Sequence, residues 1–352
     1  MPINCQKFTL LVSGNAPVLY PVNLFFGMLC YSVDDAIGIP KLYPIAGEWG
    51  TPLSTVCLNQ EDSPIPSYLD LIYLSIVERR FYSVEHILSK DELALLISRS
   101  NDDGPLYQYC VVGMAPYGGV AVWVWGPNKA SLFEWIHGEE TYVDMADFMP
   151  MNPTVTMDSN CDFYINNDKA VKENLESNGL PSRSLFDKYM QQYAYRYSIL
   201  FEQWNNDEQK WGAYDEAELV PELDGLEEAL YDGTHDKLND GGRMKYHEAG
   251  KPKKLALKWH VENNQSAAYF WFHDEGIKLF FERFYGPHPD TKSDFIIRID
   301  PDKNKYQISM YRYGLKEPVV MPEDTYELIV FRNKFEAYRS DNYNQPSGAW
   351  LW

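Results

Sequence analysis

The sequence lacks the patterns by which most enzymes and membrane proteins are recognised. It contains no GxSxG, GxxxxGK[ST] or HExxH motif and no Rossmann fingerprint. The five cysteines (Cys5, Cys30, Cys57, Cys110 and Cys161) form no CxxC pair, which argues against a disulfide framework and against a zinc knuckle. No uninterrupted apolar run reaches about 18 residues, so no transmembrane helix is expected. We therefore predict no catalytic residues, no metal and no cofactor.

A secretory signal is also missing from the sequence pattern. Residues 18–32 are fairly apolar, but Pro21 and Asn23 interrupt them. The stretch Gly27-Met28-Leu29-Cys30 has Leu29 where a lipoprotein cleavage box needs a small residue. Reduced thiols and the absence of a cleavable signal together predict a cytoplasmic protein.

Positive charge is scarce. The chain has 31 basic and 51 acidic residues, a net charge of −20. Residues 201–240 hold thirteen acidic side chains and only two basic ones. Such a field attracts a basic partner and speeds encounter, and it argues against nucleic acid and anionic membranes as ligands. The alternative is a solvated acidic face that only keeps the protein soluble. If the block binds a partner, the expected contacts are Asp207, Glu208, Trp211, Tyr214, Asp215, Glu216, Glu218, Glu222, Glu227 and Glu228.

Length and composition predict an α+β fold, mainly antiparallel β-sheet with a few helices. A chain of 352 residues suits two domains, here expected as a β-rich lobe over 1–150 and a lobe with an acidic helical segment over 151–352. The aromatic content of 15% favours strands. Each half contains strand pairs followed by a short helical stretch, which fits two related lobes, although the halves do not align well enough to establish a duplication.

Local patterns place the expected elements. A strand-rich run covers 71–82, Ser89 caps a short helix, and 107–126 forms a hairpin around Pro116-Tyr117-Gly118-Gly119. Residues 150–181 read as a linker or surface loop. Aromatic and leucine spacing predicts helices over 184–204 and about 216–230. Further strands are expected over 255–262, 267–274, 278–286, 294–300 and 305–313.

The histidines offer one weak catalytic alternative. His260 and Glu262 form an H-x-E pair on one face of an expected strand, and His273 follows nearby in sequence. A metal-assisted hydrolase could be built from these three residues if they converged in a pocket. A single pair of this kind is more often structural.

Two stretches carry a family resemblance. They are VVGMAPYGGVAVWVWGP (111–127), preceded by SIVERRFY (75–82), and IVFRNKFEAYRSDNYNQPSGAWLW (329–352), preceded by AAYFWFHDEG (267–276). These resemble the domain of unknown function 2931 family of Gram-negative bacteria, over most of the chain from about residue 65. The resemblance implies a glycine-rich hairpin and no assigned enzymatic role. Some family members lie beside toxic effectors of type VI secretion systems and look like immunity proteins.

These observations favour an immunity protein that binds and neutralises a toxic interbacterial effector in the cytoplasm by occluding its active site. The effector is expected to be basic, because acidic groups steer encounter and buried aromatic side chains hold a complex together. The rival interpretations are the metal-assisted hydrolase and a non-catalytic scaffold protein. A large self-complementary apolar patch would indicate the scaffold.

Overall fold

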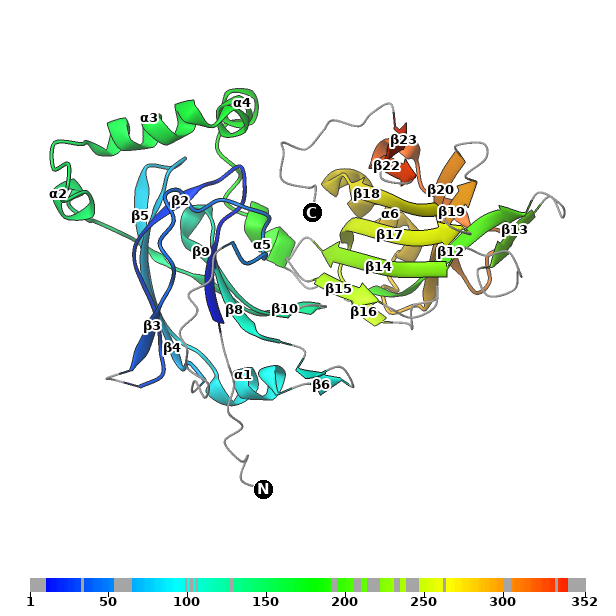
Figure 1. Ribbon diagram of the computed structural model, residues 1–352, viewed down its shortest axis with the longest axis horizontal. Coiled ribbons are helices and arrows are strands. Elements are labelled where there is room, and N and C mark those ends of the chain that lie inside the picture. The colour runs from blue at the N-terminus through cyan, green and yellow to red at the C-terminus, as the bar shows by residue number, and fades with distance from the viewer. Residues whose placement is uncertain are drawn as a thin grey trace, which may run out of the picture. The chain divides into compact units, whose positions relative to one another are not determined.

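The chain divides into two compact units, formed mainly by residues 1–190 and 191–346. The expected boundary at residue 150 lies inside the first unit. The structure, a computed structural model (Figure 1), describes residues 11–32, 35–53, 65–98, 100–101, 104–105, 107–126, 129–190, 195–205, 210–213, 222–230, 235–238, 247–261, 264–300, 305–332 and 335–340. None of the helices in these ranges is long and apolar enough to span a membrane.

The first unit contains two facing groups of strands. One runs in the order β1 (Leu11–Asn15), β8 (Tyr109–Met114), β9 (Gly119–Trp125) and β10 (Lys129–His137). The other runs in the order β11 (Glu139–Thr141), β5 (Arg80–Ile87), β4 (Tyr68–Ser75), β2 (Val22–Cys30) and β3 (Ala36–Gly38). All pairs are antiparallel except β1 with β8. The expected α+β class with mainly antiparallel sheet is confirmed.

Helices complete the first unit. Helix α1 (Lys90–Ile97) buries Leu93 and Ile97 in the core between the two strand groups. Helices α2 (Met145–Phe148) and α3 (Met157–Asn167) pack on the outer face of the β4 and β5 group through Phe148 and Cys161. Remaining short elements are α4 (Lys169–Asn178), α5 (Leu185–Met190), β6 (Ser100–Asn101), β7 (Gly104–Pro105) and the 3-10 turn η1 (Pro116–Gly118).

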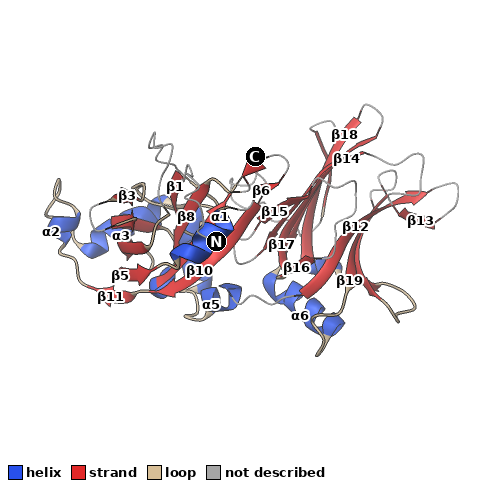
Figure 2. Ribbon diagram, turned by 90° about the horizontal axis from the view of Figure 1, so that it is seen from below, coloured by secondary structure: helices blue, strands red, loops and turns tan. Residues whose placement is uncertain are grey.

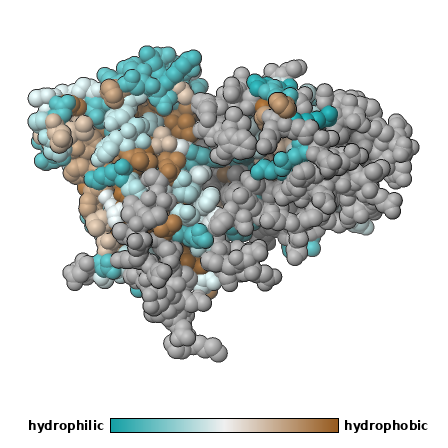
Figure 3. Space-filling model, in the orientation of Figure 1, coloured by the Kyte–Doolittle hydropathy of each residue, from teal (hydrophilic) through white to brown (hydrophobic). Residues whose placement is uncertain are grey.

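The expected linker over 150–181 is therefore wrong. Its abundant polar residues act as helix caps. The Thr156 hydroxyl accepts a hydrogen bond from the Ser159 amide and begins α3, and the Asp168 carboxylate accepts from the Ala170 and Val171 amides and begins α4. Hydrophilic side chains gather over α3 and α4 on the visible face (Figure 3). The polar composition reflects exposed helix faces and caps.

The second unit also has two strand groups, visible as two layers in Figure 2. One contains β12 (Tyr195–Asn205), β19 (Ser293–Asp300), β20 (Lys305–Arg312) and β21 (Val319–Val320) in that order, with β13 (Lys210–Ala213) and β16 (His247–Ala249) also paired to β12. The other runs β15 (His235–Leu238), β14 (Glu222–Leu230), β17 (Pro252–Val261), β18 (Asn264–Phe272), β22 (Tyr326–Arg332) and β23 (Phe335–Arg339). Helix α6 (Asp274–Tyr285) packs into the core between these layers, and η2 (Glu323–Thr325) precedes β22.

The two units repeat one topology. In each, the first strand pairs in parallel with the strand that follows the core helix: β1 with β8 after α1, and β12 with β19 after α6. The antiparallel series β3-β2-β4-β5-β11 corresponds to β15-β14-β17-β18-β22 in both chain order and pairing. Even the register irregularity near the start of β2 recurs near the start of β14. The two lobes are thus related in fold.

Three element predictions are wrong. Residues 184–204 form α5 and then strand β12, and residues 222–230 form strand β14 rather than a helix. Residues 278–286, expected as a strand, belong to helix α6, whose buried Ile277, Phe280, Phe281, Phe284 and Tyr285 follow helical spacing. The hairpin over 107–126 and the strands over 294–300 and 305–313 are confirmed.

Candidate binding site

The hairpin between β8 and β9 is built around tryptophan rings. A methyl group on Gly113 would lie 2.4 Å from the Trp123 ring and 2.8 Å from Trp49, and one on Gly119 would lie 2.3 Å from Trp135. At Gly118, φ is +77° and a methyl group would meet the Gly138 carbonyl oxygen at 2.6 Å. The glycine motif is therefore required by close packing and by one left-handed turn residue.

Two neighbouring turns converge beside this hairpin. The Tyr117 amide donates to Glu78 Oε2 at 2.8 Å, and the Tyr82 hydroxyl donates to Glu78 Oε1 at 2.9 Å. Arg79, next to Glu78, has φ 59°, and Tyr117 has φ 61°. In the described part of the chain these are the two non-glycine residues with positive φ. Such a conformation costs about 1–3 kcal/mol, and strained residues cluster at functional sites.

The turns are anchored on both sides. Arg79 extends its guanidinium to Asp158 at 2.9 Å and to Asp162 at 2.5 Å, both on α3. The Tyr117 hydroxyl donates to the Pro181 carbonyl at 2.8 Å. These contacts hold the backbone of both turns, so the side chains between them are presented in a fixed geometry.

The turns border a concave pocket of about 520 Å³. Its lining combines acidic, basic and tyrosine side chains: Glu78, Arg80, Tyr82, Tyr117, Gly138, Glu139, Glu140, Leu180 and Arg183. Arg80 forms an ion pair with Glu140 across the strand pair β5 and β11. The side chains of Glu139 and Arg183 are exposed and make no hydrogen bond or ion pair with any residue in the described ranges. They are the groups most available to a bound partner.

Burial raises the pKa of both pocket tyrosines. Burial, followed by the hydrogen bond to Glu78, raises the pKa of Tyr82 far above its ordinary value. Burial and then the Glu78 charge also raise the pKa of Tyr117. Both phenols are therefore protonated at physiological pH. The pocket offers neutral hydroxyls, three carboxylates and two guanidiniums, an arrangement suited to recognising polar and charged groups.

Most of the partner contacts expected from the acidic block cannot be placed. Asp207, Glu208, Tyr214, Asp215, Glu216 and Glu218 lie outside the described residues. Trp211 lies on β13, and Glu222 and Glu227 lie on β14, with only their backbone described.

Glu228 is placed, and its position does not suit a partner contact. Its side chain is 2% exposed, and the Tyr197 hydroxyl lies 2.6 Å from its Oε1. Tyr197 belongs to β12 and Glu228 to β14. This hydrogen bond therefore links the two layers of the second unit and leaves the carboxylate unavailable to a partner.

The structure does not bring the hydrolase candidates together. His260 pairs with Gln265 near the turn of the β17–β18 hairpin, whereas His273 follows the far end of β18. Eight residues of extended chain separate Gln265 from His273, roughly 26 Å at the usual rise of a strand. His273 lies 3.6 Å from Glu327, and Glu262 lies outside the described residues. Among the described residues, no three His, Cys, Asp or Glu side chains lie together so that they could hold a metal ion.

Sequence reasoning missed the pocket, although its residues lie in the stretches that carry the family resemblance. Glu78, Arg80 and Tyr82 come from SIVERRFY, and Tyr117 comes from the glycine-rich hairpin. The joint occurrence of these two stretches was the one sequence signal that pointed to the pocket. Sequence spacing alone does not reveal that residues nearly forty positions apart share one hydrogen bond.

The fold and this pocket define a class of protein: a two-unit α+β protein whose first unit presents a rigid, charged, tyrosine-lined pocket. The chain belongs to the family described as "Protein of unknown function (DUF2931)", whose model matches residues 2–182, more than half of the 352 residues. No curated protein and no solved structure is detectably similar to it. The match covers the first unit. The expected extension of the resemblance into the C-terminal half is not part of it.

Proposed function

We propose that this protein is a non-catalytic binding protein that blocks a basic protein partner, as an immunity protein does against a toxic effector. The observation that carries the proposal is the first-unit pocket, where two strained turns hold Glu78 and Tyr117 in a fixed arrangement. A preformed site loses little conformational entropy on binding. The choice of a type VI effector rests on the family resemblance, and its action in the cytoplasm rests on the sequence pattern that predicts a cytoplasmic protein.

Charge supports a basic partner. Carboxylates outnumber guanidiniums in the pocket lining, and the whole chain carries a net charge of −20. Long-range attraction of this kind raises the association rate, while the short-range contacts of a fixed pocket set the dissociation rate. A lysine or arginine of the partner would meet Glu139 at the rim of the pocket first.

The test is protection from a toxin. The protein encoded directly upstream would be expressed in a sensitive bacterial host with and without this chain, and growth would be measured. We expect this chain to restore growth. The two purified proteins should associate at a rate that falls steeply between 50 and 500 mM salt, since exposed charges are screened within about 8 Å at physiological ionic strength. Absence of protection together with absence of binding would refute the proposal.

Matched variants locate the contact. Glu139→Lys reverses a charge at the pocket rim, and Glu176→Lys makes the same change on the exposed face of α4, outside the pocket. We expect Glu139→Lys to slow association about tenfold and Glu176→Lys to slow it far less, because both reduce the net negative charge equally but only one disturbs the pocket. Equal effects would show that net charge matters and that the pocket does not contact the partner.

A further inference from the structure

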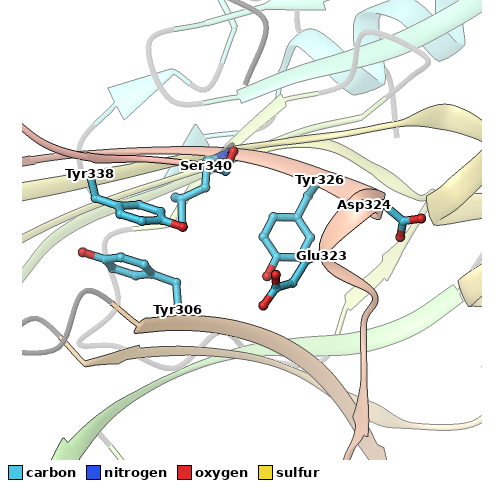
Figure 4. Close-up of a pocket in the computed structure, with 7 residues that line it drawn as sticks. Tyr306, Glu323, Asp324, Tyr326, Tyr338 and Ser340 are labelled. Atoms are coloured by element: carbon cyan, nitrogen blue, oxygen red, sulfur yellow. The ribbon is translucent and has the colours of Figure 1, made fainter. Parts of the chain in front are cut away.

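The second unit contains a separate cavity of about 220 Å³ that the proposed function does not use. The residues that line it are Tyr306, Glu323, Asp324, Tyr326, Leu328, Tyr338 and Ser340. In Figure 4, the aromatic rings of Tyr306 and Tyr338 face each other, and Tyr326 and Glu323 lie across from them. Three tyrosines and the Glu323 carboxylate thus border one small space, and the Asp324 carboxylate points away from it (Figure 4).

The fold fixes these side chains. Tyr306 comes from β20 in one layer of the unit, and Tyr326, Leu328 and Tyr338 come from β22 and β23 in the other. The Leu328 amide donates to Ser340 Oγ at 3.0 Å, and the Ser340 amide donates to the Leu328 carbonyl at 2.9 Å, which locks β23 against β22. The rings of Tyr306 and Tyr338 lie 5.0 Å apart at an angle of 36°. Contacts within the chain therefore hold the walls of the cavity in place.

The chemistry of the lining favours positive charge. The faces of aromatic rings carry negative electrostatic potential and attract ammonium and guanidinium groups. Burial, then the Glu323 charge, raises the pKa of Tyr326 to about 12, so this phenol is neutral at physiological pH. Glu323 is exposed, while Tyr326 and Leu328 are buried. A cation in the cavity would therefore lie beside one exposed carboxylate and several aromatic rings.

We propose that this cavity binds a single organic cation, an alkylammonium or guanidinium group. Its volume lies below the roughly 300–1,000 Å³ of sites that enclose a drug-sized ligand, so it suits one head group or one side-chain end. The cation could be a free amine or a basic side chain of a protein. The inference stands on the cavity itself and does not require the toxin of the proposed function.

The first experiment compares ligands of equal shape and different charge. The full chain would be titrated calorimetrically with choline and with 3,3-dimethylbutan-1-ol, the neutral carbon analogue of choline. We expect choline to bind at least tenfold more tightly, because only choline gains the attraction of the rings and of the Glu323 carboxylate. Equal affinity for the two, or no binding of either, would overturn the proposal.

Capped lysine and capped arginine amides form the second arm of the titration. Tighter binding of these amides than of choline assigns the site to basic side chains of a protein. Tighter binding of choline assigns it to free quaternary amines. Either ranking supports a cation site, provided that the neutral analogue binds weakly.

Variants then test the named rings. Tyr338→Phe keeps the aromatic face and should bind the tightest cation within twofold of the unaltered chain, whereas Tyr338→Leu should weaken binding at least fivefold. Tyr313→Leu removes a tyrosine that is 98% exposed and lies outside the cavity, and it serves as the control. A Tyr338→Leu protein that folds and binds normally would contradict the proposal. If that variant does not fold, the comparison of choline with its neutral analogue still decides.

The outcome is separable from that of the toxin assay. Loss of cation binding in Tyr338→Leu with growth protection intact would leave the proposed function standing and show that the toxin does not use the cavity. Loss of both, in a protein that remains folded, would mean that a basic side chain of the toxin enters this cavity. Protection without any measurable cation binding by the unaltered chain would sink the cavity proposal alone.

Discussion

Two glycines of the hairpin between β8 and β9 have tryptophan rings where a methyl group would lie. Gly113 faces Trp123 and Trp49, and Gly119 faces Trp135. The Trp49 and Trp123 rings are themselves in edge contact at 4.7 Å, and Trp135 Nε1 donates to Asp187 on α5 at 3.0 Å. None of these rings can move without disturbing the packing of α5. A methyl group added at either glycine therefore cannot be accommodated by a shift of the neighbouring ring.

We predict that Gly113→Ala lowers the free energy of unfolding by about 1–3 kcal/mol, the usual cost of overpacking a core. Gly38→Ala is the matched control, because the nearest atom to its added methyl group is the Gly27 carbonyl oxygen at 4.0 Å. That change should stay within about 0.5 kcal/mol. Urea denaturation of both variants measures the difference. Similar stability of the two variants would mean that the tryptophans shift easily.

The thiols of Cys30, Cys110 and Cys161 should differ in their rates of alkylation. Cys110 and Cys161 are fully buried, and burial raises the pKa of each to about 12. Cys30 is partly exposed and has a pKa raised by burial and by the neighbouring Asp70. Because the thiolate is the nucleophile, we expect iodoacetamide at pH 8 to modify Cys30 long before Cys110 or Cys161. Peptide mass mapping would show this, with urea-unfolded protein as the control in which all three react alike. Early labelling of Cys110 would reveal an opening of the first-unit core.

At the scale of elements, the sequence predicted the fold class and most of the strands but assigned four segments to the wrong type. Tyr197 and Phe201 are four residues apart, a spacing that fits a helix and equally fits alternate positions on one face of a strand. In β12 the buried residues Tyr195, Tyr197, Ile199 and Phe201 follow the strand period of two. Only pairing with β19, far away in the sequence, decides between the two.

The predictions for β14 and for α6 were wrong for different reasons. The leucines of 219–230 have helical spacing, but Gly225 lies at a register irregularity of a strand paired on both sides, so tertiary pairing overrides local preference. In α6, the acidic first turn at Asp274 and Glu275 was a readable helix signal. The pocket could not be predicted because Glu78 and Tyr117 meet only when β4, β5, β8 and β9 are assembled.

The hydrogen bond between Tyr197 and Glu228 gives a test at this scale, since it joins β12 to β14 inside a core. Tyr197→Phe removes the donor and leaves a buried carboxylate with one partner fewer. We expect a loss of about 1–3 kcal/mol in the unfolding free energy. Tyr313→Phe, at a 98% exposed tyrosine, should have no measurable effect. Unchanged stability of Tyr197→Phe in urea titration would show that another group replaces the lost hydrogen bond.

At the scale of the molecule, each unit has its own buried clusters and its own series of paired strands. The family model recognises the first unit, while the second repeats the topology without a sequence match. Core positions can therefore be refilled by different residues while pairing order persists, because a core tolerates many apolar combinations of suitable volume.

We predict that a fragment of residues 1–190 folds alone. Expected results are a cooperative urea transition and dispersed amide resonances, since the units divide at this point. The fragment of residues 191–352 is the companion test of the second core. A disordered 1–190 fragment, with the full chain unfolding in one step, would show that the units depend on each other for stability.

The parallel pairing of β1 with β8 has a consequence for how the chain is made. Leu11 pairs with Tyr109, so the first strand leaves the ribosome long before its partner is synthesised. The same delay recurs in the second unit, where Tyr197 of β12 is synthesised well before its partner Ser293 of β19. Contacts so distant in sequence are slow to form, and unpaired strand edges invite aggregation meanwhile. Because the two delays fall one after the other during translation, the nascent chain need expose only one waiting strand at a time, and the N-terminal unit can close before the second begins.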